Sequence, residues 1–169
     1  MEVRLSAAPE QRALVERLAA ALRGRGAFTA TAESCTGGLI AAACTSVAGS
    51  SDWFERGFVT YSNDEKAELL GVDTALIEAH GAVSEEVARA MAEGALVHSR
   101  AQIAVAVTGI AGPGGATKGK PVGTVWLAVA RLGAATHSEL LSLGGDRAAV
   151  REQTVQHALA RLIVMLARA

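Results

Sequence analysis

Ser34 is the candidate nucleophile of the chain, and it lies in the sequence Glu-Ser-Cys-Thr-Gly-Gly at residues 33–38. A serine at a turn between a strand and a helix can present its hydroxyl above the carboxyl end of a sheet, where open α/β folds bind ligands. The amides that open the next helix can hold a developing oxyanion. Gly37 and Gly38 lack a Cβ, so a substrate could approach the backbone closely. The alternative is that Ser34 or Thr36 only caps the helix.

Cys35 is a rival nucleophile, because a thiol is intrinsically more reactive than a hydroxyl. No histidine adjoins Cys35 in the sequence to act as its base, although a distant one could meet it in the fold. A buried cysteine on an alanine-rich helix more often only packs, and Cys44 is interpreted in the same way.

Lys66 is the candidate base for Ser34, in the sequence Tyr-Ser-Asn-Asp-Glu-Lys at residues 61–66. If Ser62 or the next residue caps a short helix, Lys66 lies in its first turns, where the helix dipole disfavours the ammonium form. A neutral lysine could take the proton of a serine hydroxyl, and Tyr61 could relay or orient that proton. The alternative is a solvated Lys66 whose charge the two preceding carboxylates offset.

A glycine-dense loop begins with Thr-Gly-Ile-Ala-Gly-Pro at residues 108–113 and continues to Gly123. Successive amides in such a loop can point at a phosphate or an oxyanion. It is not a P-loop, because no Gly-Lys-Ser/Thr opens a helix after it. It is not a dinucleotide fingerprint either, because a strand follows it. The alternative is a flexible connection.

Arg147 and Arg151 follow Gly144-Gly145-Asp146 and share one face of a predicted helix near its N-terminus. Two guanidinium groups beside free helix amides suit a phosphate group. The alternative is that both arginines pair with acidic side chains at the surface.

The elements that must position these residues follow from hydrophobic periodicity and from glycine and capping signals. Helices are predicted over about residues 9–23, 39–43, 64–70 and 74–79, and two longer helices begin after the N-caps Ser84 and Asp146. Strands are predicted over about residues 27–32, 53–61, 102–107, 123–130 and 136–143. The last two strands form an antiparallel hairpin. This order predicts a mixed sheet with helices on both faces, in one domain over residues 1–169.

Composition and net charge exclude several classes of protein. The chain has 169 residues, half of them apolar, and a formal net charge of −1, so nothing indicates broad binding to nucleic acid or to a membrane. Residues 1–5 lack the apolar core of a signal peptide, and no stretch reaches the roughly 20 uninterrupted apolar residues of a membrane span, so we expect neither. Two cysteines fit a reduced, cytoplasmic protein. The four histidines are not at metal-ligand spacing, so no metal or other cofactor is expected.

Four segments together resemble the CinA C-terminal domain family, the nicotinamide-nucleotide amidases named for competence- and damage-inducible proteins. They are residues 32–38, 61–66, 108–113 and 120–125, and they occur in the family's order. The resemblance extends from about Pro9 to the C-terminus. Four ordered motifs in a chain this short are specific, whereas any one alone is weak.

The resemblance implies a three-layer α/β/α sandwich with a mixed, mostly parallel sheet of about five strands. It implies hydrolysis of nicotinamide mononucleotide to nicotinate mononucleotide and ammonia, with Ser34 as nucleophile, Lys66 as base and Tyr61 assisting. It also implies a homodimer. The residues expected to bind the substrate or the oxyanion are Cys35, Thr36, Gly37, Gly38, Thr108, Gly109, Ala111, Gly112, Arg147 and Arg151. A non-catalytic module that binds or senses nucleotides is the alternative.

Overall fold

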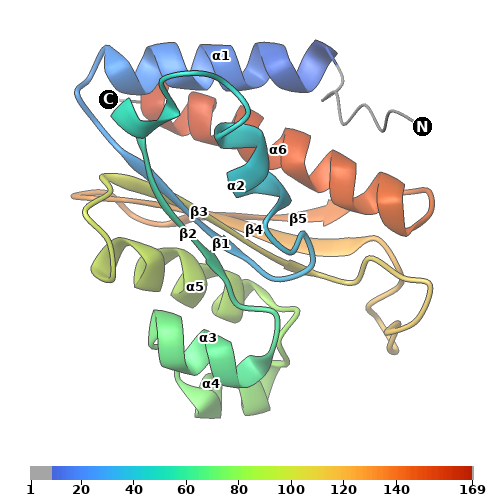
Figure 1. Ribbon diagram of the computed structural model, residues 1–169. Coiled ribbons are helices and arrows are strands. Elements are labelled where there is room, and N and C mark those ends of the chain that lie inside the picture. The colour runs from blue at the N-terminus through green and yellow to red at the C-terminus, as the bar shows by residue number, and fades with distance from the viewer. Residues whose placement is uncertain (1–8, 169) are drawn as a thin grey trace.

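The computed structural model describes residues 9–168, and its centre is one five-stranded sheet (Figure 1). The strands are β1 (Thr29–Glu33), β2 (Phe54–Val59), β3 (Ile103–Gly109), β4 (Thr124–Arg131) and β5 (His137–Ser142), in the spatial order β2-β1-β3-β4-β5. β1 is parallel to β2 and β3, whereas β4 is antiparallel to both of its neighbours. Four of the five strands therefore run in one direction, which confirms the mixed, mostly parallel sheet and the terminal hairpin.

Helices cover both faces of the sheet (Figure 1). One layer holds α1 (Pro9–Arg23), α2 (Leu39–Cys44) and α6 (Arg147–Ala167), and the other holds α3 (Asn63–Leu70), α4 (Thr74–His80) and α5 (Glu85–Val97). A short 3₁₀ helix, Ser50–Asp52, precedes β2 and was not predicted. The order of the other elements is the predicted one, and so is the three-layer α/β/α fold.

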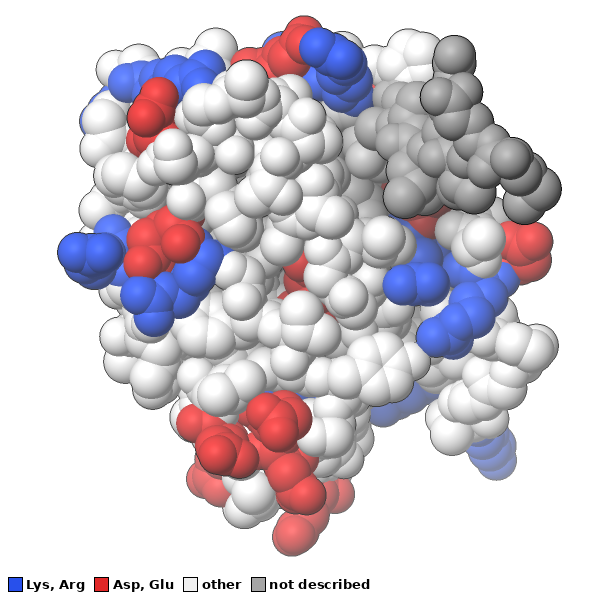
Figure 2. Space-filling view, viewed as in Figure 1, with Lys and Arg blue, Asp and Glu red and all other residues white. Residues whose placement is uncertain are grey.

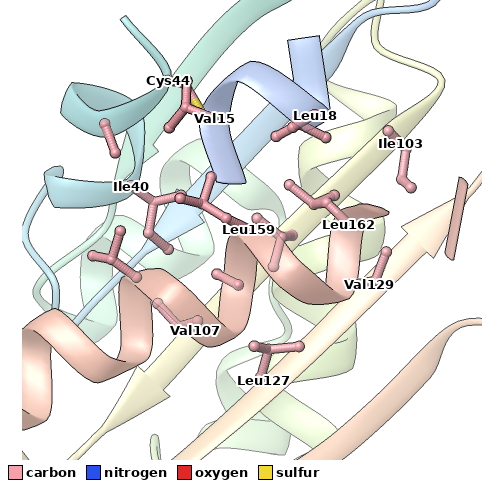
Figure 3. Packing of buried hydrophobic residues seen from close by; sticks show 14 of the residues in the cluster. Val15, Leu18, Ile40, Cys44, Ile103, Val107, Leu127, Val129, Leu159 and Leu162 are labelled. Carbon is pink, nitrogen blue, oxygen red and sulfur yellow. The ribbon is translucent and has the colours of Figure 1, made fainter. Parts of the chain in front are cut away.

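The two faces of the central strands carry side chains of different size. In β3, Ile103, Val105 and Val107 face the α1–α2–α6 layer, where they pack with residues such as Leu159 (Figure 3). The opposite face carries alanines, among them Ala104, in the cluster that includes α5. Small side chains let α5 lie close to the sheet. Both faces are buried, so β1 and β3 are almost continuously buried along their lengths, as expected for strands covered on both sides.

The ends of two strands differ from the prediction in a way that matters for the site. β1 continues to Glu33, so Ser34 is the first residue after the strand. β3 continues to Gly109, because Thr108 pairs with Trp126 and Gly109 with Val125 of β4. Thr108 therefore lies on a sheet strand and not in a flexible loop.

Acidic and basic side chains are interspersed over most of the face shown in Figure 2. The exception is a group of acidic side chains at the bottom of that view, over α3 and α4. No helix within residues 9–168 has the length and the apolar composition needed to cross a membrane.

Candidate active site

The candidate catalytic residues meet at the carboxyl edge of the three parallel strands. Ser34 follows β1, Tyr61 follows β2, and Thr108 lies at the end of β3. Backbone hydrogen bonds continue the pairing past the strand ends, since Ser34 N donates to Val107 O (3.1 Å) and Thr60 N donates to Glu33 O (2.9 Å). Because parallel strands end at the same edge, three motifs far apart in the sequence become neighbours.

A pocket of about 200 Å³ lies at this edge. Its lining includes the expected residues Ser34, Cys35, Tyr61, Lys66, Thr108, Gly109, Ala111 and Arg147. The other expected site residues do not line it. Thr36, Gly37 and Gly38 lie in the turn after Ser34, Gly112 accepts a hydrogen bond from Arg147, and Arg151 lies on α6 and donates to Thr36 O.

Lys66 and Ser34 are within hydrogen-bond distance, with 3.1 Å between Lys66 Nζ and Ser34 Oγ. Ser62 caps α3 by accepting a hydrogen bond from Glu65 N, as one of the two predicted caps, and this places Lys66 in the second half of the first turn. Lys66 Nζ also donates to Thr60 O (2.9 Å) and lies 3.4 Å from Ser62 O. The segment after β2 therefore holds the amine in place against the nucleophile.

Lys66 is a buried residue, with an exposed fraction of 1%, and not the solvated residue of the alternative interpretation. Burial lowers the pKa of Lys66, because removing the ammonium from water disfavours its charged form. The charge of a Cys35 thiolate would act in the opposite direction and is the smaller influence. The environment therefore favours the neutral amine that a general base requires.

Cys35 also lines the pocket, but its thiol is a poor candidate for the nucleophile. Burial is the main reason that the pKa of Cys35 rises to about 11, so the thiolate is scarce near neutral pH. The pKa of Cys44 rises to about 12 for the same reason. Ser34, which has a base beside it, is the better nucleophile.

The turn after Ser34 has a backbone conformation that favours glycine at two positions. Gly37 and Gly38 have φ values of +58° and +101°, in the region that favours glycine. Gly37 N donates to Ser34 O (3.0 Å), and this closes the turn. The conformation of the turn therefore requires glycine at both positions, whether or not a substrate also approaches the backbone there.

Glu33 was missed as a functional candidate by the sequence reasoning. Its carboxylate accepts hydrogen bonds from Ile40 N (2.8 Å) and Ala41 N (2.9 Å). The amides that open α2 are therefore already occupied and cannot also hold an oxyanion, contrary to the expectation. The N–H groups of Cys35, Thr36 and Gly38 have no backbone acceptor among residues 9–168, and those of Cys35 and Thr36 adjoin the nucleophile most closely in the sequence.

Tyr61 lines the pocket with an exposed fraction of 58%. Its hydroxyl oxygen accepts a hydrogen bond from Arg147 Nη2 (3.0 Å) and makes no hydrogen bond with Ser34 or Lys66. Arg147 Nη1 in addition donates to Gly112 O (3.0 Å). Arg147 thus links the segment after β2, the glycine-dense loop and the start of α6.

The glycine-dense loop is ordered by specific contacts. Thr108 Oγ1 donates to Ala82 O (2.8 Å), which ties the end of β3 to the segment before α5. A Cβ on Gly112, whose φ is +84°, would lie 2.5 Å from Val122 Cγ1. The loop is therefore packed at this point and not merely flexible.

A second cavity, of about 680 Å³, adjoins the first and shares Ala111 and Arg147 with it. It is lined in addition by Arg151 and by Gly145 and Asp146, the residues just before α6. Asp146 caps α6 by accepting from Ala149 N (2.9 Å), as predicted. Arg151 Nη2 donates to Thr36 O (3.1 Å), and within the described chain its buried Nε has no hydrogen-bond partner. Two arginines and a helix N-terminus therefore converge on one cavity.

No group of three or more histidine, cysteine, aspartate or glutamate side chains that could hold a metal ion occurs in residues 9–168.

The fold and the site define an α/β/α protein with a serine and a buried lysine paired at the carboxyl edge of its sheet. The chain belongs to the CinA family, because the family model of the CinA C-terminal domain matches residues 11–166.

Individual relatives agree with this assignment. Nicotinamide-nucleotide amidohydrolase PncC of Escherichia coli K12 is 54% identical over 151 residues, which are 88% of this chain and 90% of that protein. A CinA-like protein of Akkermansia muciniphila is 56% identical over 134 residues, 79% of this chain. The crystal structure of competence/damage inducible protein CihA from Agrobacterium tumefaciens has a TM-score of 0.93 at 46% identity, covering 95% of this chain and 98% of that one. The chain spans only 32% to 37% of longer relatives such as the A. muciniphila protein.

Proposed function

We propose that the protein hydrolyses the carboxamide of nicotinamide mononucleotide, giving nicotinate mononucleotide and ammonia. The observation that carries the proposal is the 3.1 Å contact between Ser34 Oγ and the buried Lys66 Nζ in a pocket at the sheet edge. Relatives that share half of the sequence over most of this chain bear the name nicotinamide-nucleotide amidohydrolase. The name of these relatives supports the choice of substrate, and the serine–lysine geometry supports the choice of mechanism.

In the first half of the reaction, neutral Lys66 takes the hydroxyl proton as Ser34 Oγ forms a bond to the carboxamide carbon. The N–H groups of Cys35 and Thr36 stabilise the oxygen that becomes negative. When the tetrahedral intermediate collapses, the C–N bond breaks, and Lys66 returns its proton to the departing ammonia. The product of this half is an ester between Ser34 and the nicotinoyl group.

In the second half, water attacks the ester carbon and Lys66 accepts a proton from that water. The bond between the carbon and Ser34 Oγ breaks, and Ser34 recovers its proton from Lys66. The carboxylate product leaves the pocket. The sequence of steps returns both side chains to their starting protonation states and uses only water and groups of this chain.

The cavity beside Arg147 and Arg151 suits the phosphate of the nucleotide. Arg147 has both η nitrogens engaged with Tyr61 and Gly112, whereas Arg151 retains a buried Nε with no partner among residues 9–168. The shared lining of the two cavities lets one substrate place its amide at Ser34 and its phosphate near α6. Anchoring the distant phosphate helps to hold the amide in attack geometry.

Ammonia release from nicotinamide mononucleotide, nicotinamide riboside and free nicotinamide tests this function. We expect the phosphorylated compound to have the highest kcat/KM, with turnover abolished in Ser34→Ala and retained in Cys35→Ala. Loss of turnover in Cys35→Ala but not in Ser34→Ala would overturn the nucleophile. Binding of the nucleotide without ammonia release would indicate a non-catalytic nucleotide-binding module.

A further inference from the structure

Glu33 is a fully buried carboxylate that takes no part in the mechanism above. One carboxylate oxygen accepts from Thr36 Oγ1 (2.7 Å) and Ile40 N (2.8 Å). The other accepts from Thr31 Oγ1 (3.2 Å) and Ala41 N (2.9 Å). Each oxygen therefore faces one backbone N–H, which can only donate, so both oxygens must act as acceptors.

The charge of Glu33 is balanced by hydrogen-bond donors and not by a cation. Among residues 9–168 no lysine, arginine or histidine forms an ion pair with this carboxylate. Burying a carboxylate is costly even when it is well bonded, and an apolar side chain of similar volume would avoid that cost. An apolar side chain would, however, leave the N–H groups of Ile40 and Ala41 without the acceptors that the start of α2 needs. Capping of α2 therefore explains two of the four hydrogen bonds, and the two threonine contacts are left to explain.

The position of the donors indicates what the carboxylate does. Glu33 immediately precedes Ser34, whereas Thr36, Ile40 and Ala41 all follow it. The hydrogen bonds thus tie the end of β1 to the turn and to α2 across the nucleophile.

Arg151 holds the same turn through a second contact. Its Nη2 donates to the backbone oxygen of Thr36, whose side chain donates to Glu33. Thr36 is therefore fixed at both its hydroxyl and its carbonyl, one through β1 and the other through α6.

We propose that Glu33 is a positioning residue for Ser34, an inference that rests on the proposed function. By accepting from Thr36 it fixes the turn in which Ser34 Oγ lies within reach of Lys66 Nζ. By accepting from Ile40 and Ala41 it fixes where α2 begins, and it leaves the N–H groups of the turn to the oxyanion.

Two threonine variants separate this role from simple stabilisation. Both Thr36→Val and Thr31→Val remove one hydroxyl from the same carboxylate and keep the side-chain shape, but only Thr36 belongs to the turn. We expect Thr36→Val to lower kcat for ammonia release by about 10-fold or more, with KM changed by less than about 3-fold, because small displacements of a nucleophile are costly. Thr31→Val should keep the kcat of the unchanged protein. Equal kcat values in the two folded variants would overturn the proposal.

Glu33→Gln is the direct test, because its NH₂ group must face one of the two backbone N–H donors. We expect kcat to fall by about 100-fold, with circular dichroism unchanged. Amide hydrogen exchange at Ile40 and Ala41 should become faster than in Thr31→Val. Unchanged exchange and unchanged kcat would contradict a positioning role. If Glu33→Gln does not fold, the threonine pair decides the question.

Hydrogen exchange also separates this inference from the proposed function. If the unchanged protein releases no ammonia from nicotinamide mononucleotide, the proposed function fails. Faster exchange in the turn and α2 of Thr36→Val, relative to Thr31→Val, would then still support Glu33 as the group that fixes the turn. Equal exchange in the two variants would refute it independently of activity.

Discussion

At the scale of single residues, the reactivity of the site depends on where Lys66 is buried. Its amine lies 3.1 Å from Ser34 Oγ and 2.9 Å from Thr60 O, and the Lys66 side chain is almost completely buried. The carbonyl contact orients the amine, and the burial lowers its pKa. Burial therefore shifts the amine toward its neutral form, and the carbonyl contact holds Nζ beside the serine hydroxyl.

The pH dependence of turnover follows from the lowered pKa of Lys66. The neutral amine is the active form, so kcat/KM should rise with pH as Lys66 loses its proton, and the midpoint should lie below the ordinary lysine pKa of 10.5. Lys66→Met should lower kcat by about 100-fold or more and remove this rise. The measurement is a pH–rate profile of ammonia release for both proteins, with thermal unfolding as the check on folding. A folded Lys66→Met protein with an unchanged profile would exclude lysine as the base.

The lowered pKa of Lys66 also makes the free energy of unfolding depend on pH. The folded protein holds Lys66 with a pKa below its value in the unfolded chain, so the unfolded state binds more protons between these two pKa values. The contribution of Lys66 to stability therefore becomes more favourable as pH rises through that interval. Protonation in the folded state opposes both catalysis and stability.

At the scale of elements, the sequence predicts the strand–turn–helix unit around Ser34 well, because the motif itself contains the glycines that the turn requires. The sequence does not predict that Lys66 is buried, since two carboxylates precede it and the helix has little apolar periodicity. That burial results from contacts of α3 with other elements.

The role of Glu33 is not predicted from the sequence, because a charged residue at the end of a strand is usually exposed to solvent. The sequence feature that indicates burial of Glu33 is its position, directly after the four preceding buried residues of β1 and shortly before the start of a helix.

Gly94 shows how closely α3, the helix that carries Lys66, packs against α5. A Cβ on Gly94 would lie 2.1 Å from Leu70 O, a backbone atom that cannot move aside without moving α3. Replacing glycine by alanine inside a helix ordinarily stabilises it by about 1 kcal/mol. Here we expect Gly94→Ala to lower the free energy of unfolding by about 1–3 kcal/mol, because of overpacking, and to lower kcat as Lys66 shifts.

Urea unfolding and ammonia release measure both effects of Gly94→Ala. Gly114→Ala is the control, since a Cβ there would meet no atom within 4 Å, and it should leave both quantities almost unchanged. A stabilised Gly94→Ala protein would show that the contact between α3 and α5 is looser than the structure indicates.

At the scale of the whole molecule, the sheet brings together residues that no local pattern connects. The hydrogen bond between Arg147 and Tyr61 joins positions 86 residues apart, and the shared edge of β1, β2 and β3 makes it possible. The order of elements is predictable from periodicity and turn signals, but the pairing of these two side chains depends on the packing of α6 over the sheet.

The homodimer and the cytoplasmic location stay predictions. Light scattering with the purified protein would measure its mass in solution and so test the homodimer.

Substrate binding should stabilise the whole fold, because the two cavities join α6 to the segments after β1, β2 and β3. Ser34→Ala allows this to be measured without turnover. At a concentration 100 times the Kd, a ligand adds about 2.7 kcal/mol to the free energy of unfolding. We expect nicotinamide mononucleotide to raise the Tm of Ser34→Ala more than the same concentration of nicotinamide riboside. Adding Arg151→Ala should remove most of that difference, since Arg151 lines the cavity proposed for the phosphate and its Nε has no hydrogen-bond partner among residues 9–168. Equal Tm shifts for the two ligands in Ser34→Ala would place the phosphate outside the cavity beside α6.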